Sequence, residues 1–311
     1  MKTVKWYVFH FLVKRFQNVI KLFLVIMPTT YAHWRFGVDC IETLPEDLKQ
    51  IVLNNRELFD IGVHGPDVFF YDLRHPNIPK YGSTMHHNPA RGFFEHAAEV
   101  YNQYDDEKDA MLSYLLGFLS HYTLDSQCHA YINGKNYSNE LLTHNKVESE
   151  YDGHLMRKDG RSVAQTNRAE SLKPDKHTAK VMARFFPFSE KEMLRTSKAQ
   201  RLIISALNCK SDLKRKAAEK ILNRLKMYNY RDLIVQKDEM SECADSNLRI
   251  DKLKTYALEI YPDLTRQLMN LIREGKQLGP YFDHDFDPEP DEDTPVLSLE
   301  EERTYIPKKI I

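Results

Sequence analysis

The chain has 311 residues, of which 42% are hydrophobic and 29% charged, and its formal net charge is −1. This composition is ordinary for a globular protein with a sizeable core, and the balanced charge argues against a general nucleic-acid binder. Glycine and proline are scarce, at 11 and 14 residues, so the sequence favours an all-α protein with a single multi-helix domain. The four cysteines form no CxxC pair, which argues against a disulfide framework or a cysteine-based zinc site.

Residues 1–26 form an apolar extension that five basic residues interrupt. No charge-free run approaches the ~20 residues of a membrane-spanning helix, and the last apolar run is shorter than the ~7–15 residues of a signal peptide's apolar region. Two interpretations remain: a basic amphipathic helix on a membrane surface, or a stretch that precedes a translation start at Met27. We expect a protein of the cytoplasm or the inner membrane face, with secretion as the alternative.

Helices are predicted from about residue 27 to 275, and these residues make up the expected domain. A first helix is predicted at 44–57. Gly62, Gly65 and Pro66 then predict a turn, and 73–84 is expected to be a loop. From residue 276 the acid- and proline-rich sequence predicts a flexible, loosely ordered tail. Apolar residues spaced three and four apart predict further helices, with a polar loop at 133–139; these helices lie at 92–104, 110–132, 140–156, 176–185, 190–207, 213–228 and 250–272.

The most informative stretch is SHYTLDSQCH, in which His121, Asp125 and His129 follow one another at intervals of four. Residues four apart lie on one face of a helix, and two imidazoles with a carboxylate are the donors that zinc prefers. A shorter form of the pattern follows at His144 and Glu148. The alternative is a polar helix face that is solvent-exposed or satisfied within the core.

Several upstream residues add to this pattern. His33 lies in the aromatic string AHW, and Asp67 follows a Gly-Pro turn, where an aspartate commonly serves as a cap. His86 and His87 are adjacent, so we expect at most one of them to point into a given site. His64 is a weaker candidate ligand. We expect Asp152 to be a solvated acidic residue. We expect Cys128 to be packed within its helix.

Taken in chain order, these residues resemble the bacterial zinc-dependent phospholipase C family, whose fold and metal site the single-strand-specific zinc nucleases share. The resemblance rests on the strings AHW, GPD, MHH, HYTLD and HNKVE, and it covers about residues 28–155 by motif. It implies two or three zinc ions held by the eight matched positions. These are His33, Asp67, His86 (or His87), His121, Asp125, His129, His144 and Glu148.

The resemblance also assigns roles. One zinc would be held by Asp67, His86 and His121, and a second by His129, His144 and Glu148; Asp125 would bridge from the first to a third, shared with His33. Asp67 would also help to deprotonate the attacking water. Two departures concern the metal count. The family's amino-terminal ligand, about thirteen residues before the first histidine, has no counterpart here, and Asp125 and His129 are closer in sequence than in the secreted enzymes.

The expected function is zinc-dependent cleavage of phosphodiesters, most simply a phospholipase C reaction that releases a phosphorylated head group. A nuclease or nucleotidase on the same metal site is the alternative within enzymes, although no stable nucleic-acid partner is expected. A non-catalytic metal-binding protein at a membrane surface is the alternative outside them. The aromatic residues near the motifs either line a head-group pocket or belong to the core; they are Tyr31, Trp34, Phe69, Phe70 and Tyr71.

Overall fold

The computed structural model describes residues 30–310 except residues 73 and 140, so the apolar extension at 1–26 and both interpretations of it lie outside the described residues. All regular structure among the described residues is helical, which confirms the all-α prediction. The α-helices are α2 (Tyr31–Thr43), α3 (Glu46–Asn54), α4 (Arg56–Gly62), α5 (Asn77–His86), α6 (Ala90–Gln103), α7 (Lys108–Ser138), α8 (His144–Lys158), α9 (Lys176–Phe185), α10 (Glu190–Leu207), α11 (Asp212–Arg224), α12 (Tyr228–Asp232), α13 (Ala244–Glu274) and α14 (Leu299–Thr304). Short 3₁₀ helices are η1 (Gly65–Tyr71), η2 (Ser241–Cys243) and η3 (Pro280–Asp283).

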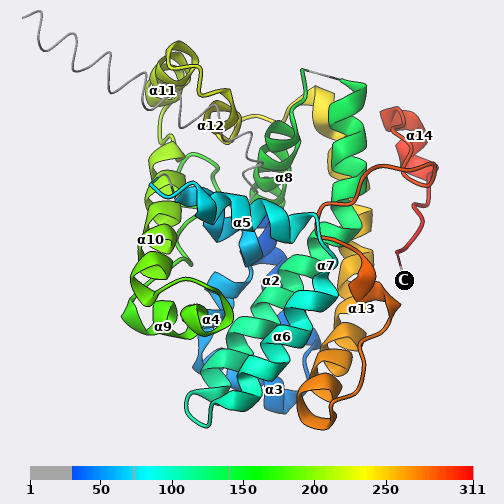
Figure 1. Ribbon diagram of the computed structural model, residues 1–311. Coiled ribbons are helices and arrows are strands. Elements are labelled where there is room, and N and C mark those ends of the chain that lie inside the picture. Colours follow the sequence, from blue (N-terminus) through cyan, green and yellow to red (C-terminus); the bar gives the residue numbers. More distant parts are fainter. Residues whose placement is uncertain (1–29, 73, 140, 311) are drawn as a thin grey trace, which may run out of the picture.

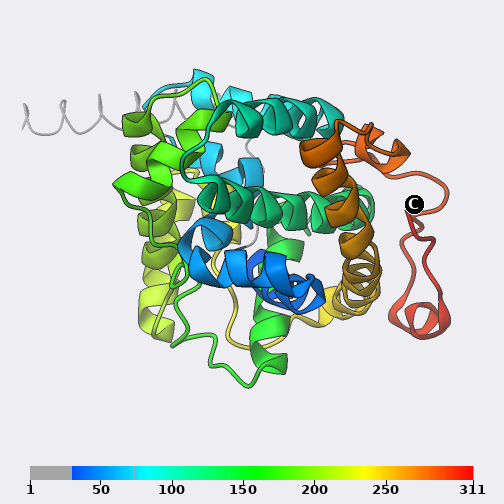
Figure 2. The same cartoon turned by 90° about the horizontal axis from the view of Figure 1, so that it is seen from below.

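The helix α7 forms the centre of the molecule. Every residue from Ala110 to Asn133 is buried, and a helix that is buried all round must be covered on all sides. The helices α4 and α13 supply most of that cover, and α2, α3, α6, α8 and α9 add to it. In Figures 1 and 2, α13 lies on one flank of the bundle, and α9 and α10 lie on the other.

The bounds of α9 and α10 agree with the sequence prediction. Each begins with a capping box, in which Asp175 or Ser189 accepts a hydrogen bond from the backbone N–H three residues on, and the side chain there returns one. Such boxes satisfy two of the backbone N–H groups that a helix start leaves without a partner. Because the two residues of a box are three positions apart, the sequence itself indicates where the helix begins.

Two predicted loops are wrong. The prediction of a loop at 73–84 fails because α5 occupies most of it; Pro79 lies in the first turn, where its missing N–H costs no helical hydrogen bond. The predicted polar loop at 133–139 is mostly the last turn of α7. There Asn133 bonds to Asp287, and Lys135 pairs with Asp245, so tertiary contacts hold these polar residues in the helix.

Other helix ends differ from prediction. The segment predicted as one helix at 44–57 divides at Asn55 into α3 and α4. The helix predicted at 213–228 ends at Arg224, two residues before Lys226 with a positive φ of 57°. The long helix α13 begins six residues before the predicted start at residue 250.

The acidic segment from residue 276 is not the loosely ordered tail that its composition predicts. Tyr281, Phe282 and Phe286 are buried in the core. Glu302 is also buried, where it pairs with Arg249 of α13. The tail prediction is wrong because the segment's few aromatic side chains have apolar places to fill, which composition averaged over the segment does not reveal.

Two further sequence expectations concern cysteine and the membrane. All four cysteines are free thiols, and Cys128 is packed within α7 as expected. No described helix combines the length and the apolarity that crossing a bilayer requires.

Candidate metal centre

Seven of the eight predicted ligands come together in two buried groups. The first is Asp67, His86, His121 and Asp125, and the second is His129, His144 and Glu148. In each group one donor atom per residue lies within 4.8 Å of the others, and every member is buried. The two groups are adjacent, because Asp125 and His129 are successive members of one row on α7.

Four elements deliver these side chains. Residues four apart on α7 project from one face, which places His121, Asp125 and His129 in line. The 3₁₀ helix η1 presents Asp67, and His86 ends α5. At the start of α8, His144 and Glu148 are one turn apart. Thr143 fixes that start, since its hydroxyl accepts a hydrogen bond from the backbone N–H of residue 146.

In the first group, a hydrogen bond behind the ring orients His86. His86 donates from Nδ1 to the carbonyl of Gly82 (2.7 Å), which leaves Nε2 facing Asp67 Oδ1 at 3.0 Å. His121 Nε2 lies 2.9 Å from Asp125 Oδ2. Of the two adjacent histidines, His86 faces Asp67 and its side chain is 7% exposed, whereas the His87 side chain is 56% exposed and lies in neither group.

The second group centres on Glu148. Its Oε1 lies 3.3 Å from His129 Nε2 and 3.4 Å from His144 Nε2. Both imidazoles use Nδ1 elsewhere: His129 bonds the carbonyl of Phe286 at 2.9 Å, and His144 bonds Asn133 Oδ1 at 2.8 Å. Each imidazole therefore presents Nε2 to the same carboxylate.

His33 falls outside both groups. Its Nε2 lies 3.2 Å from Asp125 Oδ1, and its ring stacks on that of His121 with centroids 4.4 Å apart. Asp125 thus contacts His33 as well as His121, as the predicted bridging role requires. A cavity of about 20 Å³, close to the volume of one water or ion, lies against His33, Asp125 and His129. The described residues form no third cluster of three candidate ligands.

The donor set fits a metal ion. Six atoms of the two groups are buried with no hydrogen-bond partner among the described residues: Asp67 Oδ2, His121 Nδ1, His121 Nε2, Asp125 Oδ2, His144 Nε2 and Glu148 Oε2. Unpaired buried polar atoms are rare in folded proteins, because each costs roughly 1–3 kcal/mol. Imidazole nitrogens and carboxylate oxygens directed at one another are the ligands of zinc, and a cation between them removes the penalty.

The electrostatics of the site follow from burial and mutual charge. Burial lowers the pKa of His33 to about 3. Burial raises the pKa of Glu148, but His144 and His129 outweigh it and hold that pKa at about 2. The same competition, with His121 as the strongest opposing group, lowers the pKa of Asp125. At Asp67 burial prevails and raises the pKa. A cation among these groups favours their ionised carboxylates further, by Coulomb attraction.

Sequence reasoning misassigned or missed several neighbours. The expectation that Asp152 is solvated is wrong: it is buried, pairs with Arg168 at 3.1 Å, and accepts hydrogen bonds from the first backbone amides of α2. His64 is buried near the site but belongs to neither group. Asn133 and Asp287, which contact the second group's imidazoles, were missed. One lay in a predicted loop and the other in a run of acids, so neither gave a distinguishing signal.

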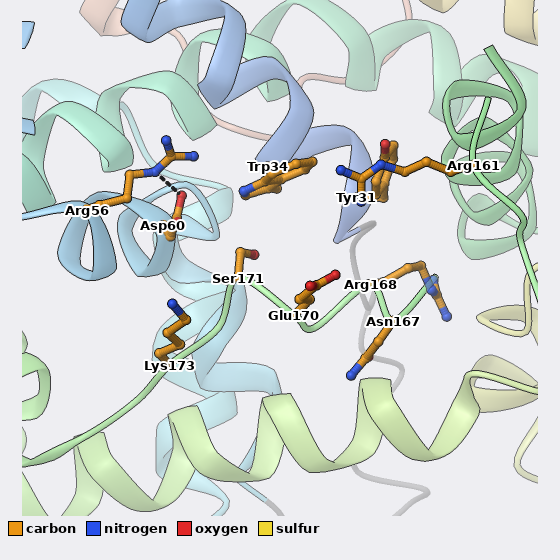
Figure 3. A pocket seen from close by; sticks show the side chains of 10 residues that line it. All are labelled: Tyr31, Trp34, Arg56, Asp60, Arg161, Asn167, Arg168, Glu170, Ser171 and Lys173. Carbon is orange, nitrogen blue, oxygen red and sulfur yellow. Dashed lines mark hydrogen bonds and ion pairs between the residues drawn. The ribbon is translucent and has the colours of Figure 1, made fainter. Parts of the chain in front are cut away.

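The aromatic residues prove to be mainly core. Tyr31, Phe69, Phe70 and Tyr71 are buried. Tyr31 and Trp34 also border a separate pocket of about 310 Å³, which contains none of the predicted ligands (Figure 3). There the guanidinium of Arg161 lies 5.3 Å from the Trp34 ring centroid and 5.7 Å from that of Tyr31, so a cation of the protein already occupies these ring faces.

Comparison with known proteins agrees with this geometry. Searches of curated proteins and of solved structures found no match. Residues 32–199, more than half of the chain, match the family described as "Zinc dependent phospholipase C". The matched range includes all eight predicted ligands and ends before α11. The chain therefore belongs to the zinc-dependent phospholipase C family.

Proposed function

We propose that the protein is a zinc-dependent hydrolase of phosphodiesters that cleaves phospholipids in the manner of a phospholipase C. The observation that supports this best is the adjacency of the two buried ligand groups, with imidazole Nε2 atoms directed at carboxylates. In this proposal Asp67, His86, His121 and Asp125 hold one zinc, and His129, His144 and Glu148 hold a second. His33 and Asp125 are available to a third.

Zinc bound there supplies positive charge for the phosphoryl oxygens and lowers the pKa of bound water toward ~7. The chain's own residues supply the rest. The carboxylates limit the net positive charge of the centre, and the backbone carbonyls behind His86 and His129 keep their Nε2 atoms free. Asp67, whose Oδ2 has no hydrogen-bond partner among the described residues, takes the proton of the attacking water. As the water oxygen bonds to phosphorus, the bond from phosphorus to the glycerol oxygen breaks, and that oxygen leaves as the alcohol with the proton that Asp67 had accepted.

The test is metal content and turnover of the full-length chain and its Asp67→Asn variant. The wild type is expected to hold two or three zinc ions and to release phosphorylated head groups from phospholipid vesicles. Asp67→Asn is expected to lose at least ~100-fold in turnover while it retains the zinc at His129, His144 and Glu148. His96→Gln, which changes an exposed histidine of α6 outside both ligand groups, is the control and should keep both.

Three results contradict parts of the proposal. Zero or one zinc per chain, measured without chelator, removes the multinuclear mechanism. Bound zinc with no turnover on any phosphodiester favours the non-catalytic metal-binding alternative. Faster turnover of single-stranded DNA than of vesicles favours the nuclease alternative; none of the residues that border the 20 Å³ cavity is a lysine or arginine, which argues against that alternative.

The outer surface of α11 supports a lipid substrate. None of its residues is buried, and its outward side exposes Leu213 (80%) and Ile221 (58%). These lie two helical turns apart, with Lys216 and Lys220 beside them on the same side. Basic residues around apolar side chains suit the boundary of an anionic lipid bilayer, where leucine and isoleucine enter the acyl region. Nucleic-acid phosphates give no reason for the apolar pair.

We therefore expect Leu213→Ser/Ile221→Ser to bind vesicles containing phosphatidylglycerol roughly tenfold more weakly than the wild type, because two apolar contacts are lost. Cosedimentation measures this. The control is Ile306→Ser, which removes a side chain as exposed (79%) as Leu213, two residues after the end of α14. Figure 1 shows α14 on the opposite flank from α11. Equal binding by the double variant and the control would show that α11 does not face lipid.

A further inference from the structure

The C-terminal segment around residue 286 lies behind the second ligand group, outside the range that matches the family. The carbonyl of Phe286 accepts the hydrogen bond from His129 Nδ1, and Asp287 Oδ1 lies 3.5 Å from the same nitrogen. Asp287 also accepts a hydrogen bond of 2.7 Å from the Asn133 side-chain amide. Asn133 Oδ1 in turn accepts from His144 Nδ1 at 2.8 Å. This segment therefore contacts the rear of the His129 imidazole directly and reaches that of His144 through Asn133.

These contacts fix which way each group points. A carboxylate only accepts hydrogen bonds, so Asp287 requires that Asn133 present its NH₂ group to it. The Asn133 carbonyl oxygen must then face His144, which places the imidazole proton on Nδ1 and leaves Nε2 with a lone pair toward Glu148. The Phe286 carbonyl sets the same tautomer at His129. Asp287 thus determines the tautomer of His144 through Asn133 and supports that of His129 directly.

The segment is held firmly enough to do this. The backbone N–H groups of Phe286 and Asp287 both bond the carbonyl of His86, at 3.1 and 3.2 Å, which ties the segment to the first ligand group. Phe286 is buried, and the centroid of its ring lies 4.9 Å from the ring centroid of Tyr122 and 6.0 Å from that of His121. Nearby, the Tyr281 hydroxyl bonds Ser126 of α7 at 2.7 Å.

We propose that Asp287 and Asn133 are positioning residues of the second zinc site. This inference rests on the proposed metal centre and extends it beyond the matched residues. Hydrogen-bond partners behind a metal-binding histidine fix its ring and raise its basicity, and their loss commonly weakens metal binding 10–100-fold. Without Asp287, the Asn133 NH₂ group retains a longer hydrogen bond of 3.3 Å to the carbonyl of Pro288, so the orientation of the amide is held less firmly. In the flipped orientation, His144 meets an NH₂ group that opposes the Nδ1–H tautomer.

The experiment is zinc competition against a chromophoric chelator, carried out on the full-length chain. Asp287→Ala is expected to weaken one zinc ion per chain 10–100-fold and to leave the tightest remaining ion unchanged. Asp287→Asn keeps an oxygen that accepts from Asn133, so it should recover most of the affinity. The control is Asp283→Ala, which removes a 59% exposed carboxylate from the same segment, where it pairs with Arg91 and not with either ligand group.

A second readout separates positioning from general loss of structure. With ¹⁵N-labelled histidine, the NMR shifts of the metal-free protein report the tautomer of each imidazole. His144 should be an Nδ1–H tautomer in the wild type and a mixture in Asp287→Ala, while the thermal midpoint changes little. Wild-type zinc affinity and an unchanged tautomer in Asp287→Ala would overturn the positioning role and leave the metal centre intact. A wild type that binds no zinc would overturn both.

Discussion

At the scale of single residues, Gly65 decides how closely the loop of Asp67 approaches the histidines. Its φ is +46°, a region that side chains disfavour. A Cβ built there would lie 2.1 Å from the His121 ring, far inside contact distance. The glycine thus serves both the turn and the close approach of η1 to α7. The sequence indicated the turn but not the approach, which depends on a helix more than fifty residues away.

Gly65→Ala is therefore expected to destabilise the protein by about 3 kcal/mol, since it combines backbone strain with displacement of a buried imidazole. Zinc content should also fall, because Asp67 and His121 separate. Gly160→Ala is the matched control: φ is +68°, but no atom lies within 4 Å of its added Cβ. That variant should cost only ~1 kcal/mol and keep its zinc. Urea unfolding and elemental analysis of both proteins would decide the matter, and equal losses would refute a specific role for Gly65.

At the scale of helices, the crossing of α4 and α7 places η1 against the metal groups. The two helices meet at a pair of glycines. A Cβ on Gly62 would lie 2.4 Å from the carbonyl oxygen of Tyr114, and one on Gly117 would lie 2.4 Å from that of Phe59. Backbone oxygens do not move aside as flexible side chains do, so any larger residue must push the helices apart.

We expect Gly117→Ala to destabilise the fold by about 2–3 kcal/mol, although alanine is the better helix former. Gly92 in α6 is a glycine with open space beside it, since nothing lies within 4 Å of a Cβ added there. Gly92→Ala should stabilise the protein by roughly 0.5–1 kcal/mol, which is the helix-propensity gain alone. Chemical denaturation measures both. A stabilising Gly117→Ala would mean that α4 and α7 do not cross this closely.

Elements could be predicted from the sequence where local signals decide them. The capping boxes of α9 and α10 and the four-residue spacing on α7 are local, and so are most of the candidate ligands. The last turn of α7 was missed because Asn133 and Lys135 gain their partners from residues more than a hundred positions away. The helix α5 was missed because Pro76 and Pro79 indicated a loop, whereas they lie at the cap and in the first turn of the helix. The assembly behind His129 and His144 was missed for the same reason: Asp287 differs from its acidic neighbours only in what it contacts.

At the scale of the whole molecule, the C-terminal segment is part of the folded body. Arg249 of α13 and Glu302 of α14 are 1% and 0% exposed. Their side chains form two contacts, Nη2 to Oε1 at 2.6 Å and Nε to Oε2 at 3.0 Å. The guanidinium also lies between two tyrosine rings, 4.7 Å from the centroid of Tyr131 and 4.2 Å from that of Tyr305. The pair thus fastens α14 across α13, outside the bundle in Figure 1.

Glu302→Ala is expected to destabilise the protein by about 3–5 kcal/mol, because it leaves the buried guanidinium without a counter-charge. Glu300→Ala is the control, since that carboxylate is 90% exposed and pairs with the exposed Arg303; we expect a change of less than ~0.5 kcal/mol. Because the segment between α13 and α14 also touches the second ligand group, Glu302→Ala should make the chain after residue 276 more sensitive to limited proteolysis. Equal stability and equal cleavage of the two variants would show that this segment is a loosely ordered tail, as its composition predicts.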